Sequence, residues 1–247
     1  MKIALLGYGK MGKAVEKIAL AKGHEIVYKV SLENAFDFMP ISLQNVDVAI
    51  DFSMPDAAVE NINKCFEAKV PLVIGTTGWY DQFDEIKGRC LTEQQSMVYS
   101  TNFSVGVNIF FKLNKILAKM MAEQDDYDVM IEEIHHTEKK DHPSGTALTL
   151  VNQILAESKM KDSYKGRLIY NENTPSQSLK PNELLIESKR VADVTGDHFV
   201  KYESVIDGIE IRHVAKSRYG FAKGAVMAAE WLIGKKGIYT MEDILNL

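Results

Sequence analysis

The sequence predicts an α/β protein of two domains, the first with a parallel sheet and the second an α+β domain with a mixed or antiparallel sheet. Three observations predict this class. A glycine-rich turn follows an apolar run at residues 2–6, apolar runs and helical patterns then alternate up to about residue 104, and candidate strands follow one another across short turns beyond it. The 247 residues, 46% of them apolar, suffice for two such cores.

The first element is a strand, a glycine turn and a helix. Residues 2–6 are mostly apolar, and apolar residues recur at helical spacing over residues 14–19. Between them lies the pattern Gly-x-Gly-x-x-Gly, formed by Gly7, Tyr8, Gly9, Lys10, Met11 and Gly12. Such glycines allow a tight turn, close approach of a pyrophosphate and close helix–strand packing, and the helix N-terminus faces the phosphates. The motif therefore predicts a Rossmann-type dinucleotide site, although a glycine-rich turn in another α/β protein is the alternative.

The position that distinguishes NAD from NADP is atypical. An acidic residue usually closes the second strand, here residues 24–30, and binds the ribose hydroxyls. Ser31 takes that place, with Lys29 before it and Glu33 after it. No carboxylate at this position would repel a 2′-phosphate, so we expect NADH and/or NADPH as cofactor.

Three more strands are predicted in the first domain, at residues 46–50, 70–74 and 97–99, with a helix at 56–68. Each of these strands is followed by small, polar, turn-forming residues. The three tails are Asp51-Phe52-Ser53, Gly75-Thr76-Thr77-Gly78 and Ser100-Thr101-Asn102-Phe103. Because ligands of open parallel sheets bind beyond the carboxyl ends of the strands, the tails together predict a nicotinamide pocket, although each alone could be an ordinary turn.

The second domain begins with an amphipathic helix from about residue 108, whose apolar residues are Ile109, Phe110, Leu113, Ile116 and Leu117. Residues 162–182 are rich in Asn, Ser, Pro and Lys, and we expect them to form largely a long surface loop. The other predicted elements are strands at 129–131, 184–191, 198–206 and 209–214 and helices at 147–155 and 221–233.

Residues 133–146, between a predicted strand and a predicted helix, hold most of the reactive side chains of the second domain. Three of them are His135, His136 and Lys139. Ser144 suits the N-cap of the following helix, which leaves the amides of Gly145 and Thr146 free to hold an anion. Possible proton donors, a positive charge and an anion cradle suit a small carboxylate substrate. The alternative is a solvated connecting loop without a role in chemistry.

Composition argues against several classes of function. The net charge of −5 and the isolated Lys139-Lys140 pair give no support for nucleic-acid binding. No apolar segment has the length of a signal peptide or of a membrane span, so we expect a cytoplasmic enzyme without a membrane partner. Cys65 and Cys90 are too few for a disulfide framework and lack metal-ligand spacing, so no metal site is expected.

The chain resembles the 4-hydroxy-tetrahydrodipicolinate reductase family, also called dihydrodipicolinate reductase, over nearly its whole length. Residues 133–147 are similar to the long and specific family signature Glu-x-His-His-x-x-Lys-x-Asp-x-Pro-Ser-Gly-Thr-Ala. The strand tails near residues 51, 75 and 102 and the C-terminal pattern at 213–225 also match family motifs. The departures are Ser31 in place of the usual acid, Ala192 in place of a common Gly, and Asp197 in place of Glu before His198.

This resemblance implies NAD(P)H-dependent reduction of a cyclic, unsaturated dicarboxylate in the diaminopimelate pathway to lysine. It implies His135 as proton donor, Lys139 as a second acid and charge partner, and His136, Gly145 and Thr146 as carboxylate-binding positions. It also implies a homotetramer. We expect a dinucleotide-binding domain at 1–104, completed by the C-terminal helix at about 216–247, and a substrate-binding and oligomerisation domain at 105–215.

Two other functions share the glycine motif. Another two-domain NAD(P)-dependent amino-acid dehydrogenase need not have His-His-x-x-Lys followed by Pro-Ser-Gly-Thr. A non-enzymatic NAD(P)-sensing regulator would usually need a basic DNA-binding element, which the sequence lacks.

Overall fold

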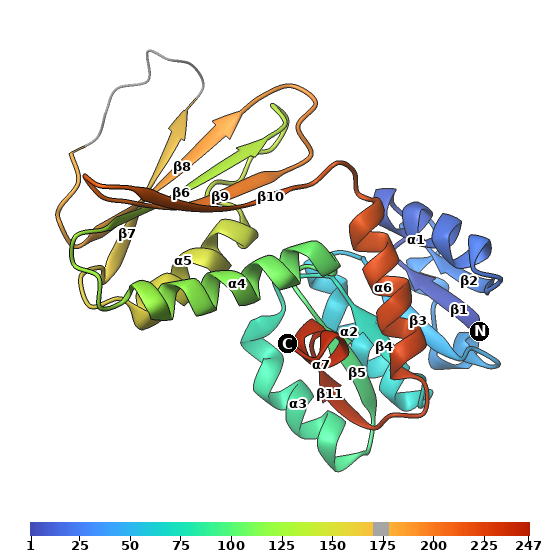
Figure 1. The fold of residues 1–247 in the computed structure, drawn as a ribbon. Coiled ribbons are helices and arrows are strands. Elements are labelled where there is room, and N and C mark those ends of the chain that lie inside the picture. Colours follow the sequence, from blue (N-terminus) through green and yellow to red (C-terminus); the bar gives the residue numbers. More distant parts are fainter. Residues whose placement is uncertain (170–177) are drawn as a thin grey trace. The chain divides into compact units, whose positions relative to one another are not determined.

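The computed structural model describes residues 1–169 and 178–247, which form two compact units (Figure 1). Unit 1 comprises Met1–Val105 and Arg218–Leu247, and unit 2 comprises Gly106–Ser217. Unit 1 is therefore made from two separate stretches of chain, with unit 2 inserted between them.

Unit 1 contains a six-stranded parallel sheet in the order β11-β5-β4-β3-β1-β2. Its strands are short and almost continuously apolar, as expected where helices cover both faces of a parallel sheet. They are β1 (Lys2–Leu6), β2 (Glu25–Val30), β3 (Val48–Asp51), β4 (Leu72–Ile74), β5 (Ser96–Tyr99) and β11 (Gly237–Tyr239). The chain leaves β1 for β2 on one side and returns to β3 on the other, so the order reverses at β1 and β3.

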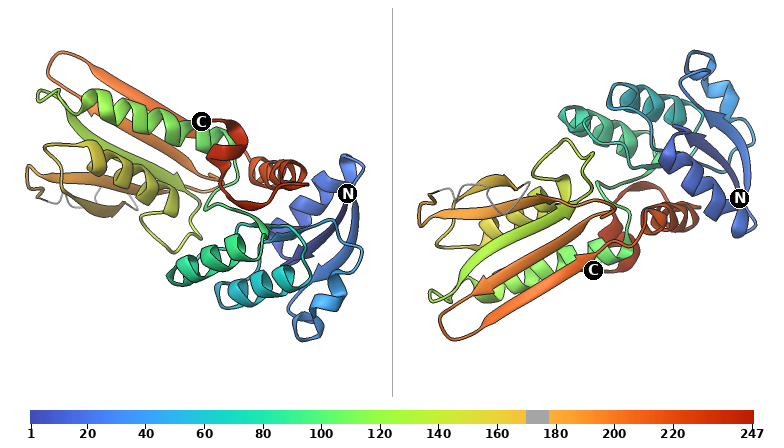
Figure 2. Two further views of the ribbon diagram at one scale, coloured as in Figure 1. Left: turned by 90° about the horizontal axis from the view of Figure 1, so that it is seen from below. Right: turned by 90° about the horizontal axis from the view of Figure 1, so that it is seen from above.

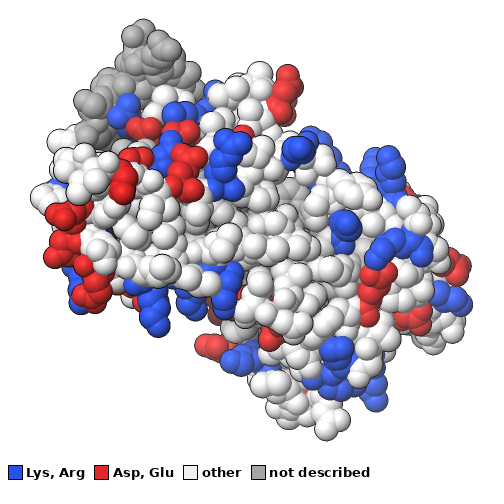
Figure 3. Space-filling view, viewed as in Figure 1, with Lys and Arg blue, Asp and Glu red and all other residues white. Residues whose placement is uncertain are grey.

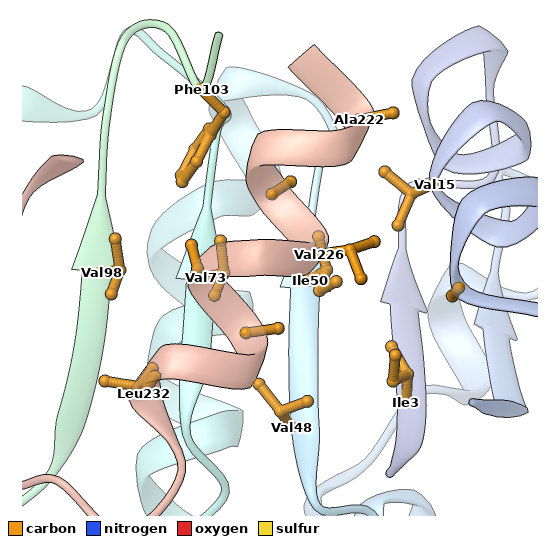
Figure 4. Packing of buried hydrophobic residues seen from close by; sticks show 14 of the residues in the cluster. Ile3, Val15, Val48, Ile50, Val73, Val98, Phe103, Ala222, Val226 and Leu232 are labelled. Atoms are coloured by element: carbon orange, nitrogen blue, oxygen red, sulfur yellow. The ribbon is translucent and has the colours of Figure 1, made fainter. Parts of the chain in front are cut away.

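Alternate residues of these strands belong to two separate cores. On one face, α1 (Lys10–Ala21) and α6 (Tyr219–Leu232) pack on side chains such as Ile3 and Ile50 (Figure 4). On the other face, α2 (Pro55–Glu67) and α3 (Phe83–Thr92) pack with Ala4 and Ala49. The buried side of α6 is mostly alanine, which allows the helix to lie close to the strands. The remaining elements are the 3-10 helices η1 (Ala35–Asp37), η2 (Pro40–Leu43) and η3 (Tyr80–Gln82) and the short helix α7 (Met241–Leu245).

Unit 2 contains a five-stranded mixed sheet in the order β10-β9-β6-β8-β7. β6 and β7 run parallel to β8, whereas β9 runs antiparallel to β6 and β10 antiparallel to β9. Helices α4 (Val105–Met121) and α5 (Gly145–Glu157) cover one face and bury its apolar residues (Figure 2). The strands are β6 (Asp128–His135), β7 (Ser163–Ile169), β8 (Glu183–Arg190), β9 (Asp197–Glu203) and β10 (Gly208–Val214).

The predicted fold class is confirmed, but α4 presents a different side to the core than its apolar pattern suggests. Ile109, Leu113 and Ile116 are 43%, 50% and 47% exposed, whereas Phe110 and Phe111 are buried. The helix carries apolar residues on more than one side, so periodicity alone could not identify the packed side.

Other boundaries also differ from expectation. The stretch expected to be mainly a loop contains the edge strand β7, while residues 170–177 of that stretch lie outside the described residues. β6 continues to His135, so this histidine closes a strand rather than lying in the following loop. The elements α3, α7 and β11 were not anticipated, because their apolar residues are few and lack a long period.

Lysines and arginines are interspersed with acidic residues on the face in Figure 3, without a continuous basic area. Among the described residues, no helix has the length and apolar character needed to cross a bilayer.

Candidate active site

A cavity of about 700 Å³ lies at the carboxyl ends of β1, β2 and β3 in unit 1. This is where the strand order reverses, the usual place for a nucleotide in an open parallel sheet. Of the residues predicted to bind the cofactor, Gly7, Tyr8, Gly9 and Ser31 line the cavity. Around them lie the apolar side chains of Leu32, Phe36, Met39, Phe52 and Met54.

The glycine turn has the close contacts that the motif requires. A Cβ on Gly7, whose φ is +91°, would lie 2.3 Å from the carbonyl oxygen of Phe52. A Cβ on Gly12 would lie 2.3 Å from the carbonyl oxygen of Gly7, so the first turn of α1 can pack against the loop only without a side chain. Beside Gly9 the space is open, and α1 begins at the next residue. The residues present therefore fit a pyrophosphate at the N-terminus of α1.

A second hollow of about 360 Å³ shares Gly9, Phe52 and Ser53 with the first. The predicted residues Lys10, Met11, Gly75, Thr76 and Thr77 line it. The two hollows together thus contain residues from the glycine turn and from the ends of β3 and β4.

A buried carboxylate joins the loops that follow β3 and β4. Asp51 has no exposed surface and accepts hydrogen bonds from the Ser53 amide at 2.8 Å, Thr76 Oγ1 at 2.6 Å and Asn61 Nδ2 at 2.8 Å. Burial raises the pKa of Asp51, while these hydrogen bonds oppose the rise. Asp51, which lies in a predicted strand tail, therefore fixes the loops together with Asn61, which the sequence gave no reason to expect in the site.

The loop of residues 100–103 lines neither of these two hollows. Ser100 Oγ donates to the Asn102 carbonyl at 2.7 Å, which closes the turn on itself. Phe103 is 1% exposed and packs in the core edge-on to Phe52, so its ring is not available to a ligand. Thr101 is exposed. Contacts from this loop to a nucleotide would have to involve its polar side chains or its backbone.

Lys29, two residues before Ser31, already has partners within unit 1. Lys29 Nζ lies 2.5 Å from Glu16 Oε1 and 4.7 Å from the centre of the Tyr8 ring, so its charge is already engaged. Ser31 is held by Asn34, whose Oδ1 accepts from the Ser31 amide at 2.7 Å. Lys64 on α2 also lines the cavity, a residue that the sequence pattern gave no reason to select.

In unit 2 the predicted catalytic residues gather between the end of β6 and the start of α5. Ser144 is the N-cap of α5, as predicted, and its Oγ accepts from the Ala147 amide at 3.2 Å. Gly145 and Thr146 open the helix, where the first amides have no partner within the helix. The peptide bond between His142 and Pro143 is cis.

Glu133, two residues before His135, has no exposed surface. Its carboxylate accepts from the Ser144 amide at 3.0 Å and from Ser188 Oγ at 2.6 Å. Its Oε2 lies 3.5 Å from His198 Nε2 and 3.7 Å from His135 Nδ1. Burial would raise the pKa of Glu133, but the hydrogen bonds of His198, Ser144 and Ser188 lower it to about 2.

Among the described residues, one group of acidic, histidine or cysteine side chains has the spacing of a possible metal site, with its potential ligand atoms all within 4.8 Å of one another. It consists of Glu133, His135 and His198. Ser144 and Ser188 already donate hydrogen bonds to the carboxylate of this group.

His135 is 7% exposed. Burial and the charge of His198 lower its pKa to about 4, although Glu133 acts in the opposite direction. The imidazole is therefore neutral near pH 7 in the absence of a ligand. A bound anion would favour the protonated form.

Lys139 and His136 lie in the loop that follows β6. Lys139 Nζ donates to both carboxylate oxygens of Asp141 at 2.7 Å. His136 is half-buried, and its Nδ1 has no hydrogen-bond partner among the described residues. Arg190, at the end of β8, donates to the Lys139 carbonyl at 3.1 Å and to the Asp141 carbonyl at 2.9 Å, and so holds this loop.

Four residues of this site, Glu133, Asp141, Arg190 and His198, were not predicted to belong to it. Glu133 and Asp141 lie within residues 133–146, so their closeness in sequence to His135 and Lys139 could have indicated that they belong to the site. Arg190 and His198 come from strands that only the pairing of the sheet brings next to β6.

We predict that the fold loses stability in acid through both Glu133 and His135. In the fold the pKa of His135 is about 4 rather than 6.5, so the unfolded chain binds more protons between these values and the free energy of unfolding falls as the pH is lowered. Glu133, with a pKa of about 2 rather than 4.5, causes a further loss below pH 4.5.

Denaturation followed by circular dichroism from pH 4 to pH 8 checks this. In His135→Gln the free energy of unfolding should depend less on pH between about pH 4 and 6.5. His142→Gln, at an exposed position of the same loop, should show the same dependence of the unfolding free energy on pH as wild type. An unchanged slope in His135→Gln would show that other groups cause the loss.

Comparisons with known proteins agree over the full chain. Residues 1–103 match the family model described as dihydrodipicolinate reductase, N-terminus, and residues 106–245 match the one described as dihydrodipicolinate reductase, C-terminus. The 4-hydroxy-tetrahydrodipicolinate reductase of Christiangramia forsetii is 48% identical over 100% of this chain and 98% of its own. That of Methanosarcina barkeri is 39% identical over 97% of this chain and 83% of its own.

Solved structures share the fold. A dipicolinate-bound dihydrodipicolinate reductase from Paenisporosarcina sp. TG-14 superposes with a TM-score of 0.76 at 21% identity, covering 99% of each chain. An amine dehydrogenase from Mycobacterium smegmatis has a TM-score of 0.62 at 12% identity, covering 96% of this chain and 94% of its own, which is likeness of fold alone. With family models over both halves and relatives of this identity, the chain belongs to the dihydrodipicolinate reductase family.

Proposed function

We propose that this protein reduces 4-hydroxy-tetrahydrodipicolinate, through dihydrodipicolinate, to tetrahydrodipicolinate with NAD(P)H, a step of diaminopimelate and lysine biosynthesis. One observation carries the proposal. In a chain of this family, a buried histidine, a lysine and the open amides of a helix N-terminus lie together at one end of the unit 2 sheet. The groups that a reductase of a cyclic dicarboxylate requires are thereby gathered in one place.

The substrate's carboxylates have suitable partners in this cluster. The Gly145 and Thr146 amides at the start of α5 favour an anion through the helix dipole and their unpaired N–H groups. Lys139 and His136 supply charge and a further donor. Lys139 is paired with Asp141, whose side chain is 67% exposed, so a carboxylate could replace that partner at little cost.

His135 is the proposed proton donor. Loss of water from the substrate leaves a conjugated C=C–C=N system, to which the nicotinamide supplies a hydride when it is bound. The electron pair displaced by the hydride must take up a proton, and His135 donates it. The negative charge of the dicarboxylate favours the imidazolium form, so His135 becomes a suitable acid only with substrate present. Lys139 stabilises the negative charge that develops.

We propose that the nucleotide binds in unit 1, with its pyrophosphate at Gly7, Gly9 and the first turn of α1. The apolar side chains beside Ser31 suit the adenosine. The absence of a carboxylate at Ser31 makes NADH and NADPH both acceptable.

Assembly as a homotetramer in the cytoplasm is a further part of the proposal. The exposed apolar residues Val205 and Ile206 between β9 and β10 support an interface in unit 2. Analytical ultracentrifugation tests it, and a monomer at micromolar concentration would refute it.

We predict that the purified protein oxidises NADH or NADPH only when the product of dihydrodipicolinate synthase is supplied. The loss of absorbance at about 340 nm is followed in a coupled assay, with the synthase omitted as control. A folded sample that oxidises neither cofactor would refute the proposed function.

His135→Ala and Lys139→Ala should each lower kcat by about 10²-fold, the usual scale for positioned acid–base groups. Nucleotide affinity, measured by fluorescence titration, should barely change because both residues belong to unit 2. Lys140→Ala, at an exposed neighbouring position, is the matched control. Normal turnover in either catalytic variant, or loss of nucleotide binding instead, would reassign the site.

Ser31→Asp should shift selectivity toward NADH, because a carboxylate there repels the 2′-phosphate and binds the free ribose hydroxyls. Wild-type protein should use both cofactors without a strong preference for NADH. The ratio of kcat/KM for the two cofactors is the measurement. An unchanged ratio would mean that Ser31 does not contact the ribose.

A further inference from the structure

We propose that Glu133 is a positioning residue for the reduction: its buried carboxylate holds the ring of His135 in one orientation and fixes it relative to the first turn of α5. The proton donor and the carboxylate-binding amides then move as one unit. This inference rests on the proposed function, and it concerns a side chain that has no contact with substrate in that proposal.

The contacts toward α5 are direct hydrogen bonds. The Ser144 amide donates to both carboxylate oxygens of Glu133, at 3.0 and 3.2 Å. The Ser144 hydroxyl lies 3.1 Å from His198 Nε2, so a second side chain of the cluster also contacts the N-cap. The position of the Gly145 and Thr146 amides is therefore tied to Glu133 through the residue immediately before them.

The Glu133 carboxylate lies close to the His135 ring without a hydrogen bond between them. His135 Nδ1 is buried, has no hydrogen-bond partner within the part of the chain that the structure describes, and lies 3.7 Å from Glu133 Oε2. A small rotation of the ring would bring Nδ1 within hydrogen-bond distance, and catalytic hydrogen bonds often tighten in this way when a ligand binds. A carboxylate at Nδ1 favours a hydrogen on that nitrogen and leaves Nε2 to deliver the proton.

The surroundings of His135 Nε2 also favour the form with the hydrogen on Nδ1. A Cβ on Gly196 would lie 3.1 Å from His135 Nε2, so the glycine leaves space beside the nitrogen that would deliver the proton. The His198 ring stands edge-on to His135, with centroids 5.1 Å apart, and limits rotation from that direction.

The pairing of the strands fixes the neighbours of Glu133 in the sheet. In the sheet register, Glu133 of β6 is opposite Ser188 of β8 on one side and His198 of β9 on the other. All three are buried, and the row crosses the three middle strands of the sheet near the end at which α5 begins. A carboxylate on a central strand is held in position more firmly than one on the loop would be.

Glu133→Gln tests the proposal, because it keeps the size of the side chain and removes its charge. Turnover should fall by about 10-fold or more. Binding of pyridine-2,6-dicarboxylate, measured by calorimetry, should weaken because one of the two oxygens that accept from the Ser144 amide is replaced by an NH₂ donor. Nucleotide affinity should stay at the wild-type value. The basic limb of the kcat–pH profile should move to lower pH, because the carboxylate no longer favours the imidazolium.

The matched control is Glu132→Gln, the same substitution one residue earlier. Glu132 belongs to the Lys189 and Lys201 ion pairs instead, so kcat and the pH profile should remain within about twofold of wild type. A merely structural role of Glu133 would lower the melting temperature but leave the pH profile and the dicarboxylate affinity of the folded fraction unchanged, and that outcome overturns the proposal.

A measurement on the wild-type protein covers the case in which Glu133→Gln does not fold. Long-range ¹H–¹⁵N spectra of protein with ¹⁵N-labelled histidine, assigned with His135→Ala, should show neutral His135 with its hydrogen on Nδ1. A hydrogen on Nε2 overturns the inference. If wild-type protein reduces no substrate, the proposed function fails, whereas normal turnover in folded Glu133→Gln refutes only the role of Glu133.

Discussion

Both candidate sites are organised by a carboxylate that has no exposed surface, Asp51 in unit 1 and Glu133 in unit 2. Ionised groups lose several kcal/mol of hydration when they are buried, so donors must replace the water from every available direction. Asp51 obtains them from its own loop, from the loop after β4 and from α2, and Glu133 obtains them from the N-cap of α5 and from β8. The need to satisfy each carboxylate therefore fixes the loops around it.

The two carboxylates differ in how their charge is balanced. Neutral donors surround Asp51, and burial raises its pKa. Glu133 has two histidines beside it in addition to its hydrogen bonds, and its pKa falls to about 2. The surroundings thus lower the pKa values of both neighbours, that of Glu133 to about 2 and that of His135 to about 4, and perturbed pKa values of this kind are common at functional sites.

The parts of the molecule predicted correctly from sequence depend on short-range patterns. The glycine turn and the N-cap at Ser144 require particular residues at fixed spacing, so Gly7, Gly12 and Ser144 could be identified directly. The packed side of α4 could not, because both sides are apolar and only the sheet beneath selects Phe110 over Ile109.

Contacts between residues on neighbouring strands could not be predicted from the sequence either. Glu133, Arg190 and His198 come together through the register of β6, β8 and β9, which no local pattern encodes. Phe103 shows the reverse case, since a residue in a polar strand tail has its ring in the core. The edge strand β7 was missed because its sequence lacks a clear apolar alternation.

The division of unit 1 into two stretches of chain has a consequence for the order in which the protein is made. Strands β1 to β5 emerge first, but α6, which covers one of their faces, lies after the whole of unit 2. Until residues 218–247 have been synthesised, the side chains of Ile3, Ile50 and Val73 on that face have no α6 to pack against. A nascent chain therefore carries an apolar surface throughout the synthesis of unit 2, and chaperones that bind such surfaces have a defined interval in which to act.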